Sequence, residues 1–441
     1  HPYGALPSGN AYFASRQLQL VRGMGLGPSL SCLSDETLGE VLSLLAGGDL
    51  ARVLQTSRTL YCHASCGELW RDVCLRELGT AHLRFEVSWR DTFARTKRRS
   101  QGPPLPLHQP LRVAGVYSNH LFRPWSCCNF DFAVACRGFF EHSDIDRVTA
   151  GALSEQQFVA QYEMRNRPVV ITELTRASSD TDTGSGTGSS PGPFRCPALT
   201  QWTPEYLAAQ CGPTHRLRAT AANASAAALF TMGEYFQYCA QAREEAPLYL
   251  FERSFAAIAP QLQSDYQIPR YFSYSGRAGW EGEARPDFRW FVAGPARSGS
   301  IFHIDPNNTN AWNLCIKGRK KWIFYPPGVS PPGVKCSPDG ADVVVPISTG
   351  EWLLTFWKYH LEARKNPDPS KRPLEVILNP GEVIFVPHGY WHMVVNLEDS
   401  IALTHNYVST SNLADVLRFL REKTDQISGV RDRIKPAAQG V

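Results

Sequence analysis

The chain has 441 residues, of which 43% are hydrophobic and 11% aromatic, and this composition excludes an intrinsically disordered protein. Its 45 basic and 41 acidic residues leave a formal net charge of +4, so no broad nucleic-acid-binding face is expected, and a local basic patch is the alternative. No apolar run reaches about 18 residues, so no membrane span is expected. The 12 cysteines include no CxxC pair and are expected to be free thiols in a reducing compartment.

The first 85 residues divide into a tail and a helical module. Residues 1–28 are glycine-rich and aperiodic, and a loose tail is expected there. Residues 29–85 predict three short amphipathic helices. The first is capped by Ser34 or Asp35, the second by Asp49, and the third covers residues 69–78. The inward apolar positions expected of the first helix follow the helical period: Leu38, Val41, Leu42 and Leu45.

The stretches "LSDETLGEVLSLL", "GDLARVLQTSRTL" and "LWRDVCLREL" of this module resemble an F-box, although the proline that often follows the first leucine is missing. The resemblance implies that residues 29–85 bind a Skp1-type adaptor of ubiquitin ligases. Because the motif is degenerate, a helical cap on the next domain is the alternative interpretation.

Residues 86–144 are interpreted as a linker. It contains the basic cluster "RTKRRS" at 95–100, which is either a nuclear localisation signal or a solvated helix end, and the proline-rich stretch 102–111. Location in the nucleus is therefore expected, with the cytoplasm as the alternative.

Residues 145–411 predict a β-rich domain. A capped helix leads into "RPVVI", and eight strand-type segments separated by Gly, Pro and Asn turns follow residue 246, which predicts an antiparallel sandwich or barrel. Residues 177–194 are of low complexity and predict a disordered insert. The segment "EWLLTFWKYH" predicts a helix that shapes substrate access. Residues 412–441 predict a C-terminal helix and tail, and this helix either packs on its own barrel or pairs with another subunit.

A candidate metal site lies in "SIFHIDP". His303 and Asp305 alternate with Ile304 on a predicted strand, so their side chains share one face about 6.6 Å apart. His392 in "VPHGYWHMVV" is the candidate third ligand. Two histidines and one carboxylate with open positions are typical of non-haem Fe(II) sites that use O₂.

The quoted stretches, together with "FRWFVAGPARSGSIFHIDPNNTNAWNLCIKGRKKWIFYPP" and "NPGEVIFVPHGYWHMVVNLEDSIALTHNYVSTSNL", resemble a JmjC (jumonji C) domain of the phosphatidylserine-receptor type. The resemblance implies an α+β fold: a double-stranded β-helix (cupin or jelly roll) over residues 145–411, preceded by the small all-α F-box-like module. It also implies that His303, Asp305 and His392 bind Fe(II), and that 2-oxoglutarate is the co-substrate.

The same resemblance implies a set of residues for 2-oxoglutarate. Lys320 matches the lysine that holds the distal carboxylate, and a buried carboxylate does need such a partner. The others are Ser300, Tyr249, Asn313, Asn406 and Thr404. The neighbouring Arg319 and Lys321 point away from Lys320 by strand alternation and are expected to be solvated. His388 is expected at the surface, and His405 is not expected to be a ligand.

The resemblance further implies an oxygenase that hydroxylates lysyl side chains or demethylates methylated arginine or lysine in histones or other basic proteins. An F-box adaptor that uses the JmjC fold only to recognise targets is an alternative, and an RNA-modifying hydroxylase is another. A cationic substrate favours acidic or aromatic walls. The available residues of that kind are Tyr274, Trp280, Glu281, Glu283, Trp290 and Trp391.

Overall fold

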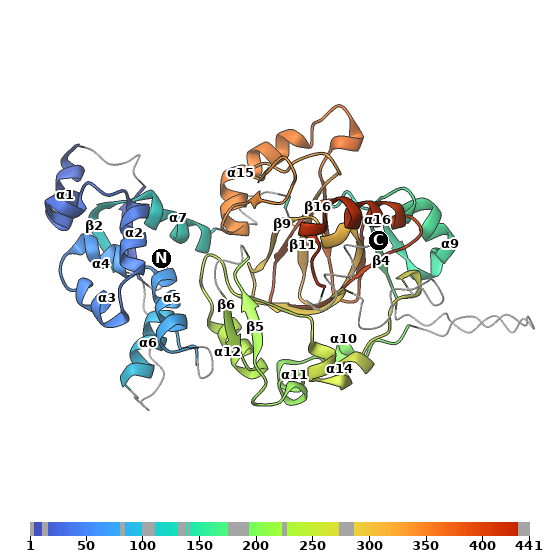
Figure 1. The fold of residues 1–441 in the computed structure, drawn as a ribbon, viewed down its shortest axis with the longest axis horizontal. Helices are drawn as coiled ribbons and strands as arrows, with labels where there is room; N and C mark the ends of the chain where they lie inside the picture. Colours follow the sequence, from blue (N-terminus) through green and yellow to red (C-terminus); the bar gives the residue numbers. More distant parts are fainter. Residues whose placement is uncertain are drawn as a thin grey trace, which may run out of the picture.

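The computed structural model describes residues 4–10, 16–79, 84–98, 111–130, 138–139, 142–174, 194–222, 227–272 and 286–430. A helical N-terminal region and a β-rich domain lie side by side (Figure 1). Most of the predicted insert at 177–194 and of the stretch 102–111 falls outside the described residues. Among the helices that the structure describes, none combines the length and the apolar character that a membrane crossing requires.

The N-terminal region contains a bundle of short helices. Ser34 caps α2 by accepting a hydrogen bond from the backbone N–H of Thr37, as the sequence predicted. Asp49 lies within the first turn of α3, whose N-cap is Ala46, and a further helix, α4, precedes the predicted third one. The helices are α1 (Arg16–Leu30), α2 (Asp35–Ser43), α3 (Gly47–Val53), α4 (Arg58–Ala64), α5 (Gly67–Glu77) and α6 (Trp89–Arg98).

Two segments expected to be irregular are structured. In place of a loose tail, residues 5–9 form strand β1 (Ala5–Gly9) and residues 16–30 form α1. The expected linker contains α6, β2 (Leu111–Tyr117) and α7 (Asn119–Cys128). Strand β1 pairs in parallel with β2, and Ala5 is buried with Val113 and Val116. The partner of β1 lies more than 100 residues away, which explains why the local sequence pattern did not indicate a strand.

The β-rich domain consists of two facing sheets, as the predicted double-stranded β-helix requires (Figure 1). The larger sheet has the order β3-β4-β15-β10-β17-β8-β7-β5-β6, and the smaller has the order β14-β11-β16-β9. All pairs in the two sheets are antiparallel except β3 with β4. The strands are β3 (Arg147–Thr149), β4 (Val169–Thr172), β5 (Leu217–Thr220), β6 (Ala227–Phe230), β7 (Tyr249–Glu252), β8 (Arg289–Gly294), β9 (Gly299–His303), β10 (Asn310–Lys317), β11 (Lys320–Tyr325), β14 (Leu374–Leu378), β15 (Val383–Val386), β16 (Trp391–Asn396) and β17 (Ser400–Tyr407). A separate hairpin joins β12 (Lys335–Cys336) and β13 (Val343–Val344).

Helices cover the outside of both sheets. The predicted "EWLLTFWKYH" helix is α15, and Trp352 on it packs edge-on against Phe302 of β9, with ring centroids 5.1 Å apart. The helices of this domain are α9 (Glu155–Phe158), α10 (Ala198–Gln201), α11 (Pro204–Cys211), α12 (Met232–Gln241), α13 (Phe255–Ile258), α14 (Pro260–Ser264), α15 (Thr349–Ala363) and α16 (Leu413–Glu422). Helix α15 therefore supports β9 from behind.

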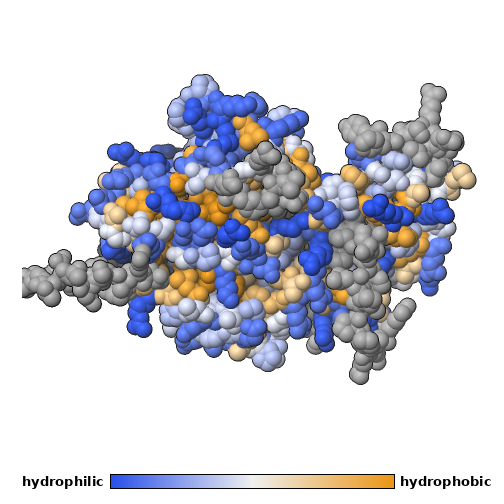
Figure 2. Space-filling view, turned by 180° about the vertical axis from the view of Figure 1, so that it is seen from behind, coloured by the Kyte–Doolittle hydropathy of each residue, from blue (hydrophilic) through white to orange (hydrophobic). Residues whose placement is uncertain are grey.

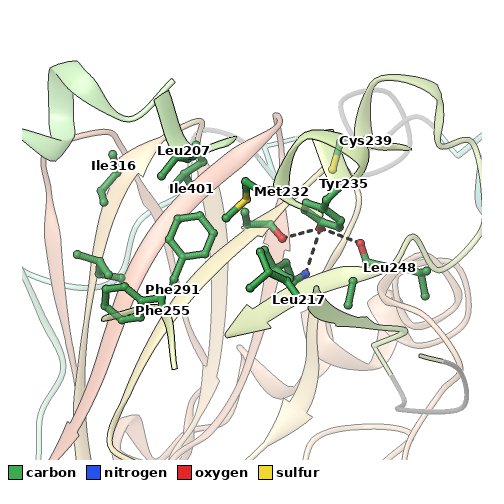
Figure 3. Close-up of a cluster of buried hydrophobic side chains, with 14 of the residues drawn as sticks. Leu207, Leu217, Met232, Tyr235, Cys239, Leu248, Phe255, Phe291, Ile316 and Ile401 are labelled. Atoms are coloured by element: carbon green, nitrogen blue, oxygen red, sulfur yellow. Dashed lines mark hydrogen bonds between the residues drawn. The ribbon is translucent and has the colours of Figure 1, made fainter. Parts of the chain in front are cut away.

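Helix α12 is anchored on the larger sheet by one tyrosine. The buried Tyr235 hydroxyl lies 3.0 and 2.7 Å from the carbonyl oxygens of Leu248 and Ala293, which share its one proton, and it accepts from the N–H of Leu250 at 3.1 Å (Figure 3). Apolar side chains such as Met232 and Phe291 surround it. These bonds satisfy backbone groups at the edge of the core without water.

The helical module and the β-rich domain share one hydrophobic core. Phe85 and Trp89 both pack against Tyr238 of α12, with ring centroids 5.0 and 6.2 Å apart. Arg71 of α5 lies 3.7 Å from Glu244, and both side chains are buried. Seen from behind, the surface is mostly hydrophilic, with hydrophobic side chains gathered in patches (Figure 2).

Candidate metal and co-substrate site

Three residues of the smaller sheet and its adjoining loop form a cluster suited to a metal ion. His303 ends β9, Asp305 follows it, and His392 lies opposite His303 on β16 in direct register. One ligand atom of each residue lies within 4.8 Å of those of the other two. The structure thus brings together the three residues that the sequence predicted as ligands.

The imidazoles of this cluster are held by backbone hydrogen bonds. The Nδ1 N–H of His303 donates to the carbonyl of Ile301 at 2.8 Å, and that of His392 donates to the carbonyl of Tyr390 at 3.1 Å. A nitrogen that faces a carbonyl carries a proton, so in the neutral form of each ring Nε2 is the atom whose lone pair can bind a metal. Fixing one ring nitrogen in this way is how proteins orient histidine ligands of metals.

The electrostatics of the cluster also suit a cation. Burial raises the pKa of Asp305, while the neighbouring His303 lowers it. Burial and the proximity of His303 hold the pKa of His392 well below its usual value, so this imidazole is neutral. Neutral imidazoles and a carboxylate are the forms that bind a divalent metal, and a bound cation would stabilise the ionised Asp305. The residues present therefore fit an Fe(II) ion.

A buried lysine lies in the same cavity as the metal cluster. Lys320 is 1% exposed, and its Nζ donates to the Tyr249 hydroxyl at 3.1 Å and to Asn396 Oδ1 at 2.7 Å. Across the described parts of the chain, no carboxylate lies within ion-pair distance of this ammonium group. A buried charge in that situation fits an anionic ligand. The cavity measures about 440 Å³ and is also lined by His303, Asp305 and His392.

The remaining predicted 2-oxoglutarate residues also line this cavity: Ser300, Asn313, Thr404 and Asn406. Asn313 Oδ1 is buried and has no hydrogen-bond partner among the described residues, so it is a polar atom available to a ligand. Asn406 donates to the Thr309 hydroxyl at 2.8 Å, and Thr404 donates to the carbonyl of Trp312 at 3.1 Å. These two side chains therefore already have structural partners.

Two residues behind Lys320 were not found from the sequence. Asn396 pairs with Lys320 across β11 and β16, and its Nδ2 donates to Ser298 Oγ at 2.9 Å. Both residues are buried, and this chain of hydrogen bonds holds the Lys320 ammonium group in place. Only the strand register identifies Asn396, and register is not visible in one sequence.

The prediction that Lys321 is solvated is wrong. Its side chain is 0% exposed and its Nζ lies 2.8 Å from Glu375 Oε2. Helix α15 covers this outer face of β11 and contributes His360, whose Nε2 donates to Glu375 at 3.0 Å. Arg364 adds a further bond to Glu375 at 2.7 Å. Strand alternation gave the correct face, but not the helix that covers it.

His142, Asp144 and Glu375 also have ligand atoms within 4.8 Å of one another. Arg364 bonds Asp144 at 2.6 Å, and Lys321 bonds Glu375. Because side-chain cations already neutralise these carboxylates, this group is interpreted as an ion-pair network and not as a metal site.

The other two histidines of the sequence analysis have clear partners. His388, expected at the surface, is 15% exposed and lies 3.4 Å from Asp415 through Nε2. His405, which was not expected to be a ligand, bonds the Tyr266 hydroxyl at 2.9 Å on the other face of β17. Trp290 lines the metal cavity. The predicted wall residues Tyr274, Trp280, Glu281 and Glu283 lie outside the described residues.

A double-stranded β-helix with two histidines and a carboxylate beside a buried lysine defines a JmjC-type cupin. Comparison with known families agrees with this class. The cupin-like domain family matches residues 154–412, and the F-box-like family matches residues 32–76. The chain belongs to the cupin-like JmjC family and carries an F-box-like module. It is thus a member of a class of iron- and 2-oxoglutarate-dependent oxygenases.

Several curated proteins are similar to the chain. The Arabidopsis thaliana protein named arginine-specific demethylase JMJ22 is 38% identical over 98% of this chain and 78% of its own length. The Caenorhabditis elegans bifunctional arginine demethylase and lysyl-hydroxylase psr-1 is 32% identical over 61% of this chain and 62% of its own length. The human 2-oxoglutarate and iron-dependent oxygenase JMJD4 is 33% identical over 39% of this chain and 40% of its own length.

Proposed function

We propose that the protein is an Fe(II)- and 2-oxoglutarate-dependent oxygenase that demethylates methylated arginine or hydroxylates lysyl side chains of a histone or another basic protein. One observation carries the proposal: a single cavity of about 440 Å³ contains both the His303, Asp305 and His392 cluster and the buried Lys320, which has no carboxylate partner among the described residues. A metal alone would explain the cluster but not the lysine.

In this proposal His303, Asp305 and His392 hold the iron, and Lys320 with Tyr249 binds the distal carboxylate of 2-oxoglutarate. When bound, these groups supply the oxidation of a C–H bond to an alcohol, with O₂ consumed and 2-oxoglutarate converted to succinate and CO₂. On an N-methyl group the product collapses to an amine and formaldehyde. Hydroxylation and demethylation therefore need the same protein residues.

The protein's own contribution is to fix and desolvate these groups. The bonds of His303 and His392 to backbone carbonyls orient both imidazoles before the metal arrives. Asn396 and Tyr249 hold the Lys320 ammonium at a fixed point, so the co-substrate binds in one orientation. Asn313 Oδ1, which has no partner among the described residues, also lines the cavity and is available to the ligand.

The similarity to JMJ22 supports arginine demethylation, because that protein carries the activity in its name and aligns with 98% of this chain. The name of psr-1 supports lysyl hydroxylation on the same fold. One experiment distinguishes the two activities. The protein is loaded anaerobically with Fe(II) and 2-oxoglutarate, and O₂ is then admitted together with methylated and unmethylated peptides from histones and other basic proteins.

In that experiment, loss of a methylene with formaldehyde release marks a demethylase, and gain of one oxygen marks a hydroxylase. Both must be absent from His303→Ala. Succinate without any peptide change leaves the enzyme class in place and rejects the peptides offered. Absence of succinate from metal-loaded protein contradicts the proposed function.

We also propose that the F-box-like module recruits a Skp1-type adaptor. The observation in favour is that two apolar side chains are exposed at the C-terminal end of α2. Val41, which was expected to point inward, is 41% exposed, and the C-cap residue Leu44 is 82% exposed. A pull-down with the purified adaptor tests this, and Leu44→Glu should abolish binding while succinate formation continues. Unchanged binding by Leu44→Glu would reject this surface.

We propose that the protein works in the nucleus, with the basic cluster at 95–100 as the signal. Residues 95–98 of this cluster form the C-terminal end of α6, where Thr96 and Lys97 are exposed, and residues 99–100 lie outside the described residues. Imaging a tagged chain with Lys97→Ala and Arg98→Ala tests the proposal, because nuclear accumulation must fall.

A further inference from the structure

A second cavity of about 830 Å³ adjoins the metal cavity at the end of β9. The two share five lining residues, which include His303 and Asp305: Ala222, Ile301, His303, Asp305 and Pro306. Its volume is in the range of cavities that hold ligands larger than a co-substrate. Because both cavities meet at the metal cluster, a side chain lying in the second cavity can reach the reacting position.

The walls of this second cavity come from three parts of the chain. The smaller sheet contributes Phe302 and Trp391, and the β12–β13 hairpin contributes Val343. The outer wall is C-terminal: α16 contributes Phe419 and Glu422, and residues 423–426 continue it. We call residues 415–428 the C-terminal wall.

The C-terminal wall is fastened to the metal loop and to the hairpin. Asn307, two residues after Asp305, donates to the carbonyl of Ser428 at 2.9 Å and accepts from its N–H at 3.1 Å. Lys423 Nζ donates to the carbonyl of Asp339 at 2.7 Å. These bonds make the wall a built part of the cavity. A loosely packed end of the chain would lack them.

The wall presents more acidic than basic groups to the cavity. Asp415, Glu422 and Asp425 line it, against Arg418 and Lys423. Arg418 is paired with Asp415 at 3.1 Å, and Lys423 is tied to the hairpin. Glu422 pairs with Arg421 at 3.0 Å, but both side chains are largely exposed, at 56% and 70%, and such a surface pair is weak. Asp425 is exposed, so both carboxylates remain accessible to a ligand. Acidic and aromatic groups together favour a cationic peptide.

We propose that this second cavity is the substrate cleft of the oxygenase, and that Glu422 and Asp425 on the C-terminal wall select peptides with basic residues. The inference rests on the proposed function and adds to it the position of the cleft and two specificity residues. The net charge of the whole chain is +4, so a preference for cationic peptides has to come from a local surface.

The test measures binding of two fluorescent peptides to the full chain loaded with Fe(II) and 2-oxoglutarate without O₂. One peptide alternates arginine with alanine, and its analogue carries neutral citrulline at each arginine. The wild type should bind the arginine peptide about tenfold more tightly, and Glu422→Gln with Asp425→Asn should remove that preference. Binding of the citrulline peptide should not change.

Glu362→Gln is the matched control, because Glu362 is an exposed helix acid paired with Lys365 and lines neither cavity. It should keep the full preference. The proposal that this cavity is the substrate cleft is overturned if the wild type binds both peptides equally. It is also overturned if the double variant keeps the preference for the arginine peptide. Succinate formation measured separately reports on the proposed function, so its failure is distinguishable from failure of the cleft.

Discussion

Lys320 and Lys321 are consecutive residues of β11, and their side chains lie on opposite faces of the smaller sheet. Both are almost completely buried, yet Lys320 bonds only neutral groups while Lys321 is paired with Glu375. A buried ammonium group without a counter-ion is unfavourable in the protein alone. The inner face of the smaller sheet is therefore organised to bind a ligand, whereas its outer face is organised for stability.

The largest effect on the inner face is expected from removing a residue of the metal cluster. His303→Ala and Asp305→Ala should each abolish detectable succinate formation, because each removes one of three ligands. The thermal midpoint of the metal-free protein should stay near the wild-type value, since neither group supports the core. Residual turnover at wild-type rates would show that the metal lies elsewhere.

Replacing each lysine in turn tests this difference between the two faces directly. Lys320→Met should raise the KM for 2-oxoglutarate by about 100-fold, because a buried ion pair with the co-substrate is lost. Lys321→Met should leave that KM unchanged and lower the free energy of unfolding by about 3 kcal/mol, because Glu375 loses a buried partner. Kinetics and urea unfolding measure the two effects, and the comparison fails if the two variants behave alike.

Asn396→Leu tests how the inner face holds Lys320. The substitution keeps the side-chain size but removes the oxygen that fixes Lys320, so the KM for 2-oxoglutarate should rise about tenfold. The kcat at saturating co-substrate should change less. Asn379→Leu, on the loop after β14, is the control, and an equal rise in KM there would point to a general structural effect.

The pH dependence of stability reports on the outer face. Burial raises the pKa of Glu375, but the bonds from His360 and the charge of Lys321 outweigh it and lower the pKa from 4.5 to about 2. A lowered native pKa stabilises the fold above the unfolded value, and this contribution is lost as pH falls from about 5 to about 2. The difference in unfolding free energy between wild type and Glu375→Gln should shrink over that range. If the difference in unfolding free energy stays constant over this pH range, the stabilising role of ionised Glu375 is contradicted.

Much of the inner face was predictable from the sequence. Alternation placed His303 and Asp305 on one side, and the motif around "VPHGYWH" supplied His392. Asn396 was missed because it is a neighbour only through strand register. Lys321 was misjudged because it is covered by α15, a separate segment whose docking on β11 no local sequence pattern reveals. Strand β1 was missed for a related reason, since its partner is distant in the chain.

The contact of Phe85 and Trp89 with Tyr238 has a consequence for how the protein unfolds. Two segments that match separate families are joined by a continuous apolar interior, so they should melt in one cooperative transition. Deleting the first hundred residues would expose Tyr238 and the buried Glu244 to water. The oxygenase would then be an unstable fragment. In the intact chain, the same rigid contact would hold any ligase bound to the helical module at a fixed angle to the metal site.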